Sequence, residues 1–438
     1  MKSLKSILPL ILPAALVATG STASGEPDGD DWPQWRGRTR DGIWRESGLL
    51  EKFPAKFEAK WTAPIGSGYC GPTVADGRVY VMDRVLDPEQ AERVHCFAWN
   101  SGRKIWTHRY PCSYEKVSYK AGPRCSVLVD DGRAYTLGAA GHLFCFDATS
   151  GERTWEHDLD KEYDIKIPNW GISASPIIHE DLLIVPACGR EAYLVAFHKK
   201  TGREAWRALT DRGNYSAPVM IRQAGRPVLV IWTATRVVGV DPGSGSLHWE
   251  VPFKPSKMPM GVATPVLAGN KLFLTGFFDG SLLIELDEEK LAAREVWRRR
   301  GRSERKTDAL HSTIGTPVVI GGHIYGVGSY GELRCLDLST GDRVWEDLTA
   351  VPRDRWATIH FVPNGDKVWM SNERGELLLG NLSPQRFEEL TRGQLIEPTT
   401  DQLERGGTGV AWSHPAFAYR HVFARNDKEL RCVDLSAK

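Results

Sequence analysis

The stretch that decides the fold is Asp147-Ala-Thr-Ser-Gly-Glu-Arg-Thr-Trp155, because it recurs twice more in the chain. It returns as Asp241-Pro-Gly-Ser-Gly-Ser-Leu-His-Trp249 and as Asp337-Leu-Ser-Thr-Gly-Asp-Arg-Val-Trp345. Each copy is a polar run that ends in glycine, followed four residues later by tryptophan. Aspartate bonds its own backbone in tight turns and glycine accepts a positive φ, so the phrase predicts a hairpin between antiparallel strands. We therefore interpret these aspartates as turn formers and not as catalytic acids.

Tryptophans extend this repeat along most of the chain, at separations of 43 to 51 residues. They are Trp61, Trp106, Trp155, Trp206, Trp249, Trp297 and Trp345. Ahead of each hairpin stand two more short apolar runs broken by glycine-containing turns, such as residues 72–82 and 317–327, and these predict two further strands. Four strands per repeat at this period are typical of a propeller blade, so we predict an all-β protein.

The repeats number eight. Six end near Trp106 to Trp345, a degenerate seventh ends at Phe387 to Leu390, and an eighth, Trp412 to Leu435, has only three strands. We expect Lys56 to Trp61 to supply the missing outer strand, because this closes the ring and removes the open edges of a linear array. The predicted fold is an eight-bladed β-propeller of four-stranded antiparallel blades, closed by an N-terminal strand. Elsewhere, only residues 288–299 carry any helical periodicity.

The first residues have the order of a secretory signal: two lysines, an apolar run from Ile7 to Val17, and small residues ending at Ala23. The run is shorter than the roughly 20 apolar residues of a spanning helix, so we expect it to be cleaved and to leave no transmembrane segment. We divide the chain into a signal peptide (1–23), a leader and linker (24–50) and a propeller domain (51–438). The expected location is periplasmic or secreted.

Charge and cysteine spacing exclude several classes. With 56 basic and 55 acidic residues, the chain has no overall charge for a nucleic-acid partner. Four cysteines occupy one slot of four repeats and are interpreted as packed thiols: Cys96, Cys145, Cys335 and Cys432. A bridge between Cys70 and Cys125, which lie in adjacent blades, is left open. There is no Cys-x-x-Cys and no His-Glu-x-x-His, so a zinc site has no support.

The phrase Asp-x-x-Thr/Ser-Gly-x-x-x-Trp, preceded by Gly-x-Leu-x-Cys/Ala-x-Asp, resembles the PQQ-like (pyrroloquinoline quinone) propeller repeat from Trp61 to Leu435. The leader Asp31-Trp-Pro-Gln-Trp-Arg-Gly37 is similar to the N-terminal segment of bacterial exported proteins with this repeat. The resemblance implies the blade but no activity. The same blade serves quinoprotein alcohol dehydrogenases, which bind PQQ and Ca²⁺, and the outer-membrane assembly lipoprotein, which binds partner proteins.

The parts that a dehydrogenase would imply are not recognisable. Those enzymes place a vicinal Cys-Cys disulfide against the quinone, and no two cysteines here are adjacent. No base or Ca²⁺ ligand can be assigned, so we expect no catalytic residue, metal or cofactor, with PQQ and Ca²⁺ as the alternative. Gly326 to Gly331 matches a dinucleotide pattern, but no helix follows, so we interpret it as a strand turn. The basic run Arg298 to Lys306 is interpreted as a solvated loop.

The candidate binding site is the channel mouth, where the connections between blades enter the inner strands. Aromatic and arginine side chains converging on one concavity suit a small molecule or a peptide, although several can equally plug the channel. The residues are Tyr69, Arg124, Trp170, Tyr215, His311, Arg355, Trp356 and Trp412.

The leading hypothesis is a non-enzymatic exported scaffold that presents a binding face in the cell envelope. Its partner is an envelope or extracellular protein, or a small ligand at the channel. The alternatives are a PQQ- and Ca²⁺-dependent quinoprotein oxidoreductase and a carbohydrate-binding propeller.

Overall fold

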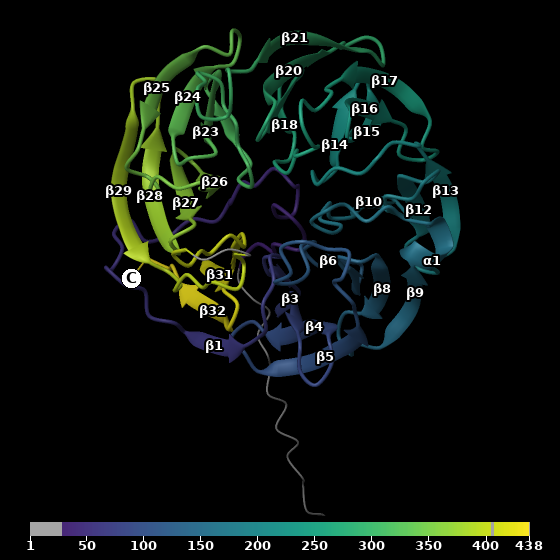
Figure 1. The fold of residues 1–438 in the computed structure, drawn as a ribbon. Helices are drawn as coiled ribbons and strands as arrows, with labels where there is room; N and C mark the ends of the chain where they lie inside the picture. The colour runs from purple at the N-terminus through teal and green to yellow at the C-terminus, as the bar shows by residue number, and fades with distance from the viewer. Residues whose placement is uncertain (1–28, 404–406, 438) are drawn as a thin grey trace, which may run out of the picture.

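The computed structural model describes residues 29–403 and 407–437, so the predicted signal peptide lies outside the described residues. The described chain forms eight four-stranded antiparallel sheets arranged as blades around a central axis (Figure 1), which confirms the predicted fold class. Within the described ranges the only helix is α1 (Leu159–Tyr163), and no helix there is long and apolar enough to cross a membrane. Residues 293–299 form a strand, so the weak helical periodicity of residues 288–299 was misleading.

The strands follow the chain blade by blade, from the inner to the outer edge of each sheet. Blades 1 to 4 consist of β2 (Thr73–Ala75), β3 (Arg78–Val85), β4 (Ala91–Ala98) and β5 (Lys104–Pro111); β6 (Leu128–Asp130), β7 (Arg133–Leu137), β8 (His142–Asp147) and β9 (Arg153–Asp158); β10 (Ile177–His179), β11 (Leu182–Pro186), β12 (Leu194–His198) and β13 (Glu204–Ala208); and β14 (Val219–Gln223), β15 (Arg226–Trp232), β16 (Arg236–Val240) and β17 (Leu247–Pro252).

Blades 5 to 8 consist of β18 (Val266–Ala268), β19 (Lys271–Gly276), β20 (Gly280–Leu286) and β21 (Ala293–Arg299); β22 (Val318–Ile320), β23 (His323–Val327), β24 (Leu333–Asp337) and β25 (Arg343–Asp347); β26 (Ile359–Asn364), β27 (Lys367–Asn372), β28 (Glu376–Leu382) and β29 (Phe387–Gln394); and β30 (Ala416–Ala418), β31 (His421–Arg425), β32 (Glu429–Asp434) and β1 (Trp61–Pro64).

The repeated tryptophan and glycine belong to one contact between neighbouring blades. The indole N–H of Trp106, on β5 of blade 1, donates to the carbonyl of Ala148 in the β8–β9 turn of blade 2 at 3.1 Å. Gly151 of that turn lies under the same ring, and a Cβ there would come within 2.5 Å of it. Trp155 repeats the arrangement on blade 3, with a 3.1 Å hydrogen bond to the carbonyl of Lys199. The glycine of each phrase therefore receives the tryptophan of the preceding blade.

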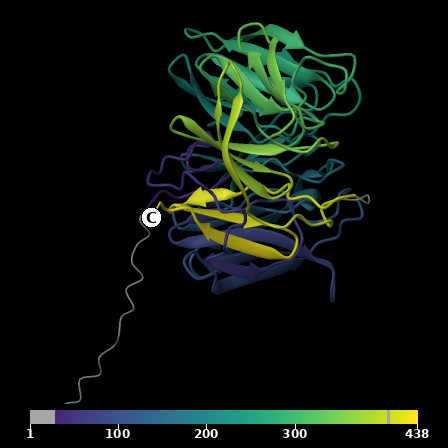
Figure 2. The same cartoon turned by 90° about the vertical axis from the view of Figure 1, so that its left-hand side faces the viewer.

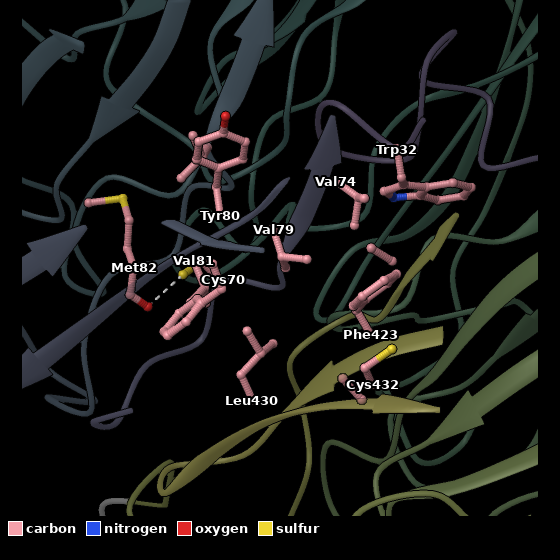
Figure 3. Close-up of a cluster of buried hydrophobic side chains, with 14 of the residues drawn as sticks. Trp32, Cys70, Val74, Val79, Tyr80, Val81, Met82, Phe423, Leu430 and Cys432 are labelled. Carbon is pink, nitrogen blue, oxygen red and sulfur yellow. Dashed lines mark hydrogen bonds between the residues drawn. The ribbon is translucent and has the colours of Figure 1, made fainter. Parts of the chain in front are cut away.

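The ring closes through the same contact. Strand β1 pairs with β32 and places Trp61 opposite Cys432 (Figure 1). The Trp61 indole donates to the carbonyl of Trp99 in blade 1 at 2.7 Å, and a Cβ on Gly102 would lie 2.5 Å from its ring. Figure 3 shows the core of this junction, where Leu430 and Cys432 of blade 8 face the valines of blade 1. Closure by an N-terminal strand is confirmed.

The bounds predicted for the closing strand were wrong. Strand β1 begins at Trp61, where the predicted segment ends. The Lys60 N–H still donates to the Cys432 carbonyl of blade 8 at 2.8 Å, but the start of the segment pairs with blade 7, since the Phe57 N–H donates to the Gln394 carbonyl at 3.0 Å. Blade 7 has Thr391 in the tryptophan position, opposite Leu379, and its hydroxyl accepts a 2.9 Å hydrogen bond from the Phe53 backbone. This part of the leader thus fills the place of the missing indole.

The leader also crosses the centre of the ring (Figure 1) and lies on one face of it (Figure 2). Trp32 exchanges backbone hydrogen bonds of 2.8 and 2.9 Å with Val74 of blade 1. The Arg40 guanidinium donates to the Pro176 carbonyl of blade 3 at 2.7 Å. Across the ring, the Trp44 N–H donates to a carbonyl of blade 7 at 2.9 Å. Residues 32–44 are therefore packed against three blades.

All eight cysteines are buried and unbridged, including Cys70 and Cys125. Four of these cysteines hold the same position in their blades: Cys96, Cys145, Cys335 and Cys432. Each lies directly opposite an outer-strand tryptophan, as Cys96 does with Trp106. Burial raises the pKa of the Cys96 thiol to about 12 and that of Cys145 to about 11. The packed-thiol interpretation is confirmed.

We predict that a thiol reagent labels few cysteines in the folded protein, because the thiols are buried and protonated. After denaturation without reductant, all eight should react. Mass spectrometry after labelling measures both states. Three or four disulfides in the denatured sample would contradict the structure.

Gly102→Ala tests ring closure, with Gly132→Ala as its matched control. Both glycines have positive φ, of 66° and 70°, so backbone strain should lower the free energy of unfolding of both variants by about 1 kcal/mol. Nothing lies within 4 Å of a Cβ on Gly132, whereas a Cβ on Gly102 meets Trp61. Gly102→Ala should therefore cost about 2 kcal/mol more in the free energy of unfolding, measured in denaturant. Equal losses would show that the indole contact does not hold the ring closed.

Candidate ligand-binding chamber

A chamber of about 160 Å³ lies in the channel where the chain enters the inner strands. Each entry has a buried slot residue, occupied in turn by Cys70, Cys125, Ala174, Ser216, Ala263, Gly315, Ile359 and Ser413. Side chains alternate in extended chain, so the neighbours of a slot residue point the other way, toward the axis. All eight entries contribute such neighbours to the wall: Tyr69, Arg124, Ser173, Ser175, Tyr215, Ala217, Val262, Ile314, His360, Trp412 and His414.

The other walls come from the connections and the leader, and they are mainly aromatic. Tyr119 is the centre of this group, since its ring centroid lies 5.4 Å from that of Trp356, 6.1 Å from Trp170 and 6.4 Å from Trp412. Tyr119 and Trp356 have φ of 56° and 69°, in the left-handed region that bulky residues seldom adopt. The surrounding structure holds both rings at a cost in backbone strain, which is a feature of binding sites.

The leader closes the chamber from the far side. Trp35 lines the chamber, and its indole N–H donates to the Thr264 hydroxyl of blade 5 at 2.9 Å. Its ring stands edge-on against His414 of blade 8, at a centroid distance of 4.5 Å. The Trp35 side chain therefore contacts both blade 5 and blade 8 and forms the far wall of the chamber.

The structure brings six of the eight predicted residues together on the wall: Tyr69, Arg124, Trp170, Tyr215, Trp356 and Trp412. Two do not line it. His311 is buried behind the wall, with Nδ1 2.8 Å from the Phe277 carbonyl. Arg355 stacks on the rings of Trp356 and Phe277, at 4.7 and 5.7 Å from their centroids. Both support the wall from outside.

Sequence reasoning missed two kinds of lining residue. Seven are slot neighbours that period-two alternation would have found: Ser173, Ser175, Ala217, Val262, Ile314, His360 and His414. Trp35, Tyr119, Met260 and Thr313 carry no repeat signal. Trp35 in particular lies in a segment outside the repeats.

The chamber is apolar and nearly uncharged. No carboxylate lines it. Burial lowers the pKa of His360 to about 4 and that of His414 to about 3, so both are neutral at pH 7. Arg124 is the one cation among the lining residues. Its guanidinium donates to backbone carbonyls, including that of Ser118 at 3.0 Å, and stacks on Tyr69 at 4.8 Å.

These residues do not fit the PQQ and Ca²⁺ of the quinoprotein dehydrogenases. Ca²⁺ takes six to eight oxygen ligands, several of them carboxylates, and no carboxylate lies on the wall. Among residues 29–403 and 407–437, no group of three or more His, Cys, Asp or Glu side chains could hold a metal ion. The lining also has no carboxylate to act as a general base for alcohol oxidation.

One buried acid stands behind the wall. Glu373 is 1% exposed, and its backbone carbonyl accepts a 2.8 Å hydrogen bond from the residue before Trp412. Burial raises the pKa of Glu373 to about 7, although the Arg374 guanidinium at 3.5 Å opposes this. The folded protein therefore keeps a proton that the unfolded chain loses near the ordinary value of 4.5. The contribution of Glu373 to the free energy of unfolding therefore falls as the pH rises from 4.5 to about 7.

We predict that Glu373→Gln flattens this dependence. Between pH 5 and 8 the wild type should lose up to about 3 kcal/mol of unfolding free energy relative to the variant. The two should be similar at pH 5. Urea unfolding at pH 5, 6, 7 and 8 measures the difference, and Glu58→Gln, at an exposed carboxyl, serves as the control. Parallel profiles for Glu373→Gln and wild type would refute the assignment.

Comparisons with known proteins agree with this architecture. Residues 90–347, more than half of the chain, match the family described as outer membrane protein assembly factor BamB. BamB of Yersinia pestis is 20% identical over 245 residues, which cover 54% of this chain and 58% of that protein. The 1-butanol dehydrogenase (quinone) of Thauera butanivorans is 29% identical over 145 residues, 30% of this chain and 23% of that protein. The chain thus matches only part of the length of either relative.

A solved europium-containing methanol dehydrogenase has the same fold. Its structure superposes with a TM-score of 0.65 at 12% identity, over 91% of this chain and 88% of that one. At this identity the likeness concerns the fold alone. The family match and the eight repeats together show that the chain belongs to the BamB-type family of PQQ-like β-propeller repeat proteins.

Proposed function

We propose that this protein is a non-enzymatic binding scaffold of the cell envelope, exported to the periplasm or secreted, and that the channel mouth is its binding face. The observation that carries the proposal is an aromatic chamber with no carboxylate on its wall. Concave, mainly apolar sites with a few polar groups are typical of ligand binding. The kinship with BamB supports a scaffold that acts through binding.

The same wall argues against the oxidoreductase alternative. The kinship with a quinone-dependent dehydrogenase supports that alternative, but it extends over less than a third of this chain. Alcohol oxidation needs a base close to the reacting hydroxyl, and His360 and His414 are weak bases because burial lowers their pKa. The carbohydrate alternative is also less well supported, since an apolar chamber leaves buried sugar hydroxyls without partners.

The size of the chamber suggests a direct test with indole. An apolar cavity of about 150 Å³ is known to hold benzene, so a chamber of 160 Å³ should take one small aromatic molecule. We expect saturable one-to-one binding of indole by calorimetry. Val262→Phe fills the chamber and should abolish binding. Val344→Phe makes the same change at a half-exposed position on β25 and should leave binding intact.

The companion measurement concerns PQQ. With PQQ and Ca²⁺ supplied, the purified protein should show no saturable PQQ binding at micromolar concentration and no dye-linked alcohol oxidation. Indole binding that survives Val262→Phe would refute the chamber as the binding site. Saturable, Ca²⁺-dependent PQQ binding that Val262→Phe abolishes would favour the oxidoreductase.

A further inference from the structure

We infer that the channel mouth recognises an acidic peptide segment, with one aromatic side chain inserted in the chamber and flanking carboxylates on a basic rim. This inference rests on the proposed function and names the ligand class of the same face. Two independent observations carry it: the dimensions of the chamber and an uneven charge distribution around its mouth.

The basic rim consists of three segments beside blade 5: the connections 253–264 and 300–316 and the β19–β20 loop 277–280. Together they contain six basic and three acidic side chains, although the whole chain is nearly neutral. They lie against one another, since the Ser256 N–H donates to Asp279 at 2.8 Å and His311 Nδ1 lies 2.8 Å from the Phe277 carbonyl. The rim is therefore one continuous patch.

The cations of this rim are exposed and available. No carboxylate of a described residue lies within ion-pair distance of the following side chains: Lys254, Lys257, Arg302, Arg305 and Lys306. The acidic Asp308 is already used, because it pairs with Arg343 on the outer strand β25 at 3.0 Å. The patch can therefore attract carboxylates without first breaking internal ion pairs.

Aromatic rings orient two of these cations. The Lys257 ammonium lies 4.7 Å from the ring centroid of Phe278, and the Arg305 guanidinium lies 4.6 Å from that of Tyr330. Such stacking restricts a long side chain while leaving its charge accessible, so less conformational entropy is lost when an anion binds.

The rim and the chamber are joined by the chain itself. Connection 253–264 carries Lys257 at the rim and contributes Met260 and Val262 to the chamber wall. Connection 300–316 likewise carries Arg305 and contributes Thr313 and Ile314. A one-ring ligand inside the chamber cannot also cover cations spread over two connections. A peptide can, because its residues advance about 3.3 Å each when extended.

The chemistry of the chamber favours a peptide over an acidic polysaccharide. A uronate chain would match the rim, but its ring inserted in the chamber would bury hydroxyls among mainly aromatic walls. A Phe, Tyr or Trp side chain buries apolar surface there instead, as the anchor residues of peptide complexes do.

The experiment uses the purified full-length protein and three heptapeptides: Asp-Glu-Asp-Trp-Asp-Glu-Asp, the same peptide with alanine for tryptophan, and the version with lysine for every acidic residue. We expect the acidic tryptophan peptide to bind at least about tenfold more tightly than either of the others. Its affinity should fall as NaCl rises from 50 to 300 mM, because exposed charges are screened. Fluorescence anisotropy of labelled peptides measures all three.

Variants separate the two parts of the site. Lys257→Glu with Arg305→Glu should weaken the acidic peptide about tenfold and leave indole binding unchanged. The control pair, Arg203→Glu with Arg226→Glu, makes a like charge change at exposed turn positions on the opposite face and should have no effect. Val262→Phe should abolish both ligands.

The outcomes distinguish this inference from the proposed function. Indole binding without preference for the acidic peptide would overturn the inference and leave the scaffold proposal standing. An acidic peptide whose affinity is unchanged in the rim variant would also overturn it. Tighter binding of an oligogalacturonate, dependent on Lys257 and Arg305 but not on the chamber, would replace the peptide by a polysaccharide. A wild-type protein that does not bind indole would refute the proposed function itself.

Discussion

The contact on which the whole structure depends is the indole of one blade lying over the glycine of the next. At five of the eight junctions the outer strand of one blade carries a tryptophan ring over a glycine in a turn of the next blade. The turn accepts the ring because glycine has no Cβ and tolerates a φ near 70°. A hydrogen bond from the indole N–H to a turn carbonyl fixes its orientation, as for Trp297 and the Leu338 carbonyl at 3.0 Å. Because blades touch mainly their neighbours, this local contact, repeated around the axis, sets the geometry of the ring.

The propeller fold was predictable from sequence because the tryptophan–glycine contact recurs at a regular spacing along the chain. Trp155 and Gly202 meet in space but belong to consecutive copies of one phrase, so a constant spacing records the docking of one blade on the next. Where the phrase decays the prediction loses accuracy, as in blade 7, where Thr391 stands in the tryptophan position. There Phe53 and Phe57 supply aromatic bulk from outside the repeat, and no periodicity could have indicated that.

The chamber was predictable only in part, for a related reason. Residues beside the buried slot residues, such as Tyr69 and Trp412, follow from the alternation of an extended chain. Tyr119 and Trp356 lie on irregular connections with left-handed backbone, where neither period nor turn chemistry predicts direction. No carboxylate lies on the chamber wall. Fold and site are set by different residues: the fold by the outer strands, the site by what the connections carry to the axis.

The pairing of β1 with β32 has a consequence for biosynthesis. The chain is made from its N-terminus, so Trp61 is available first, whereas its partner Cys432 emerges only after blades 1 to 7 have been made. Until then the inner strands of blade 8 do not exist. Strand β1, whose Trp61 contacts Gly102, therefore has no strand of blade 8 to pair with. Contacts between such distant residues form slowly, because a long loop must close before they stabilise anything. The ring therefore stays open until the strands of blade 8 have been made, and the incomplete ring presents strand edges with unpaired backbone groups.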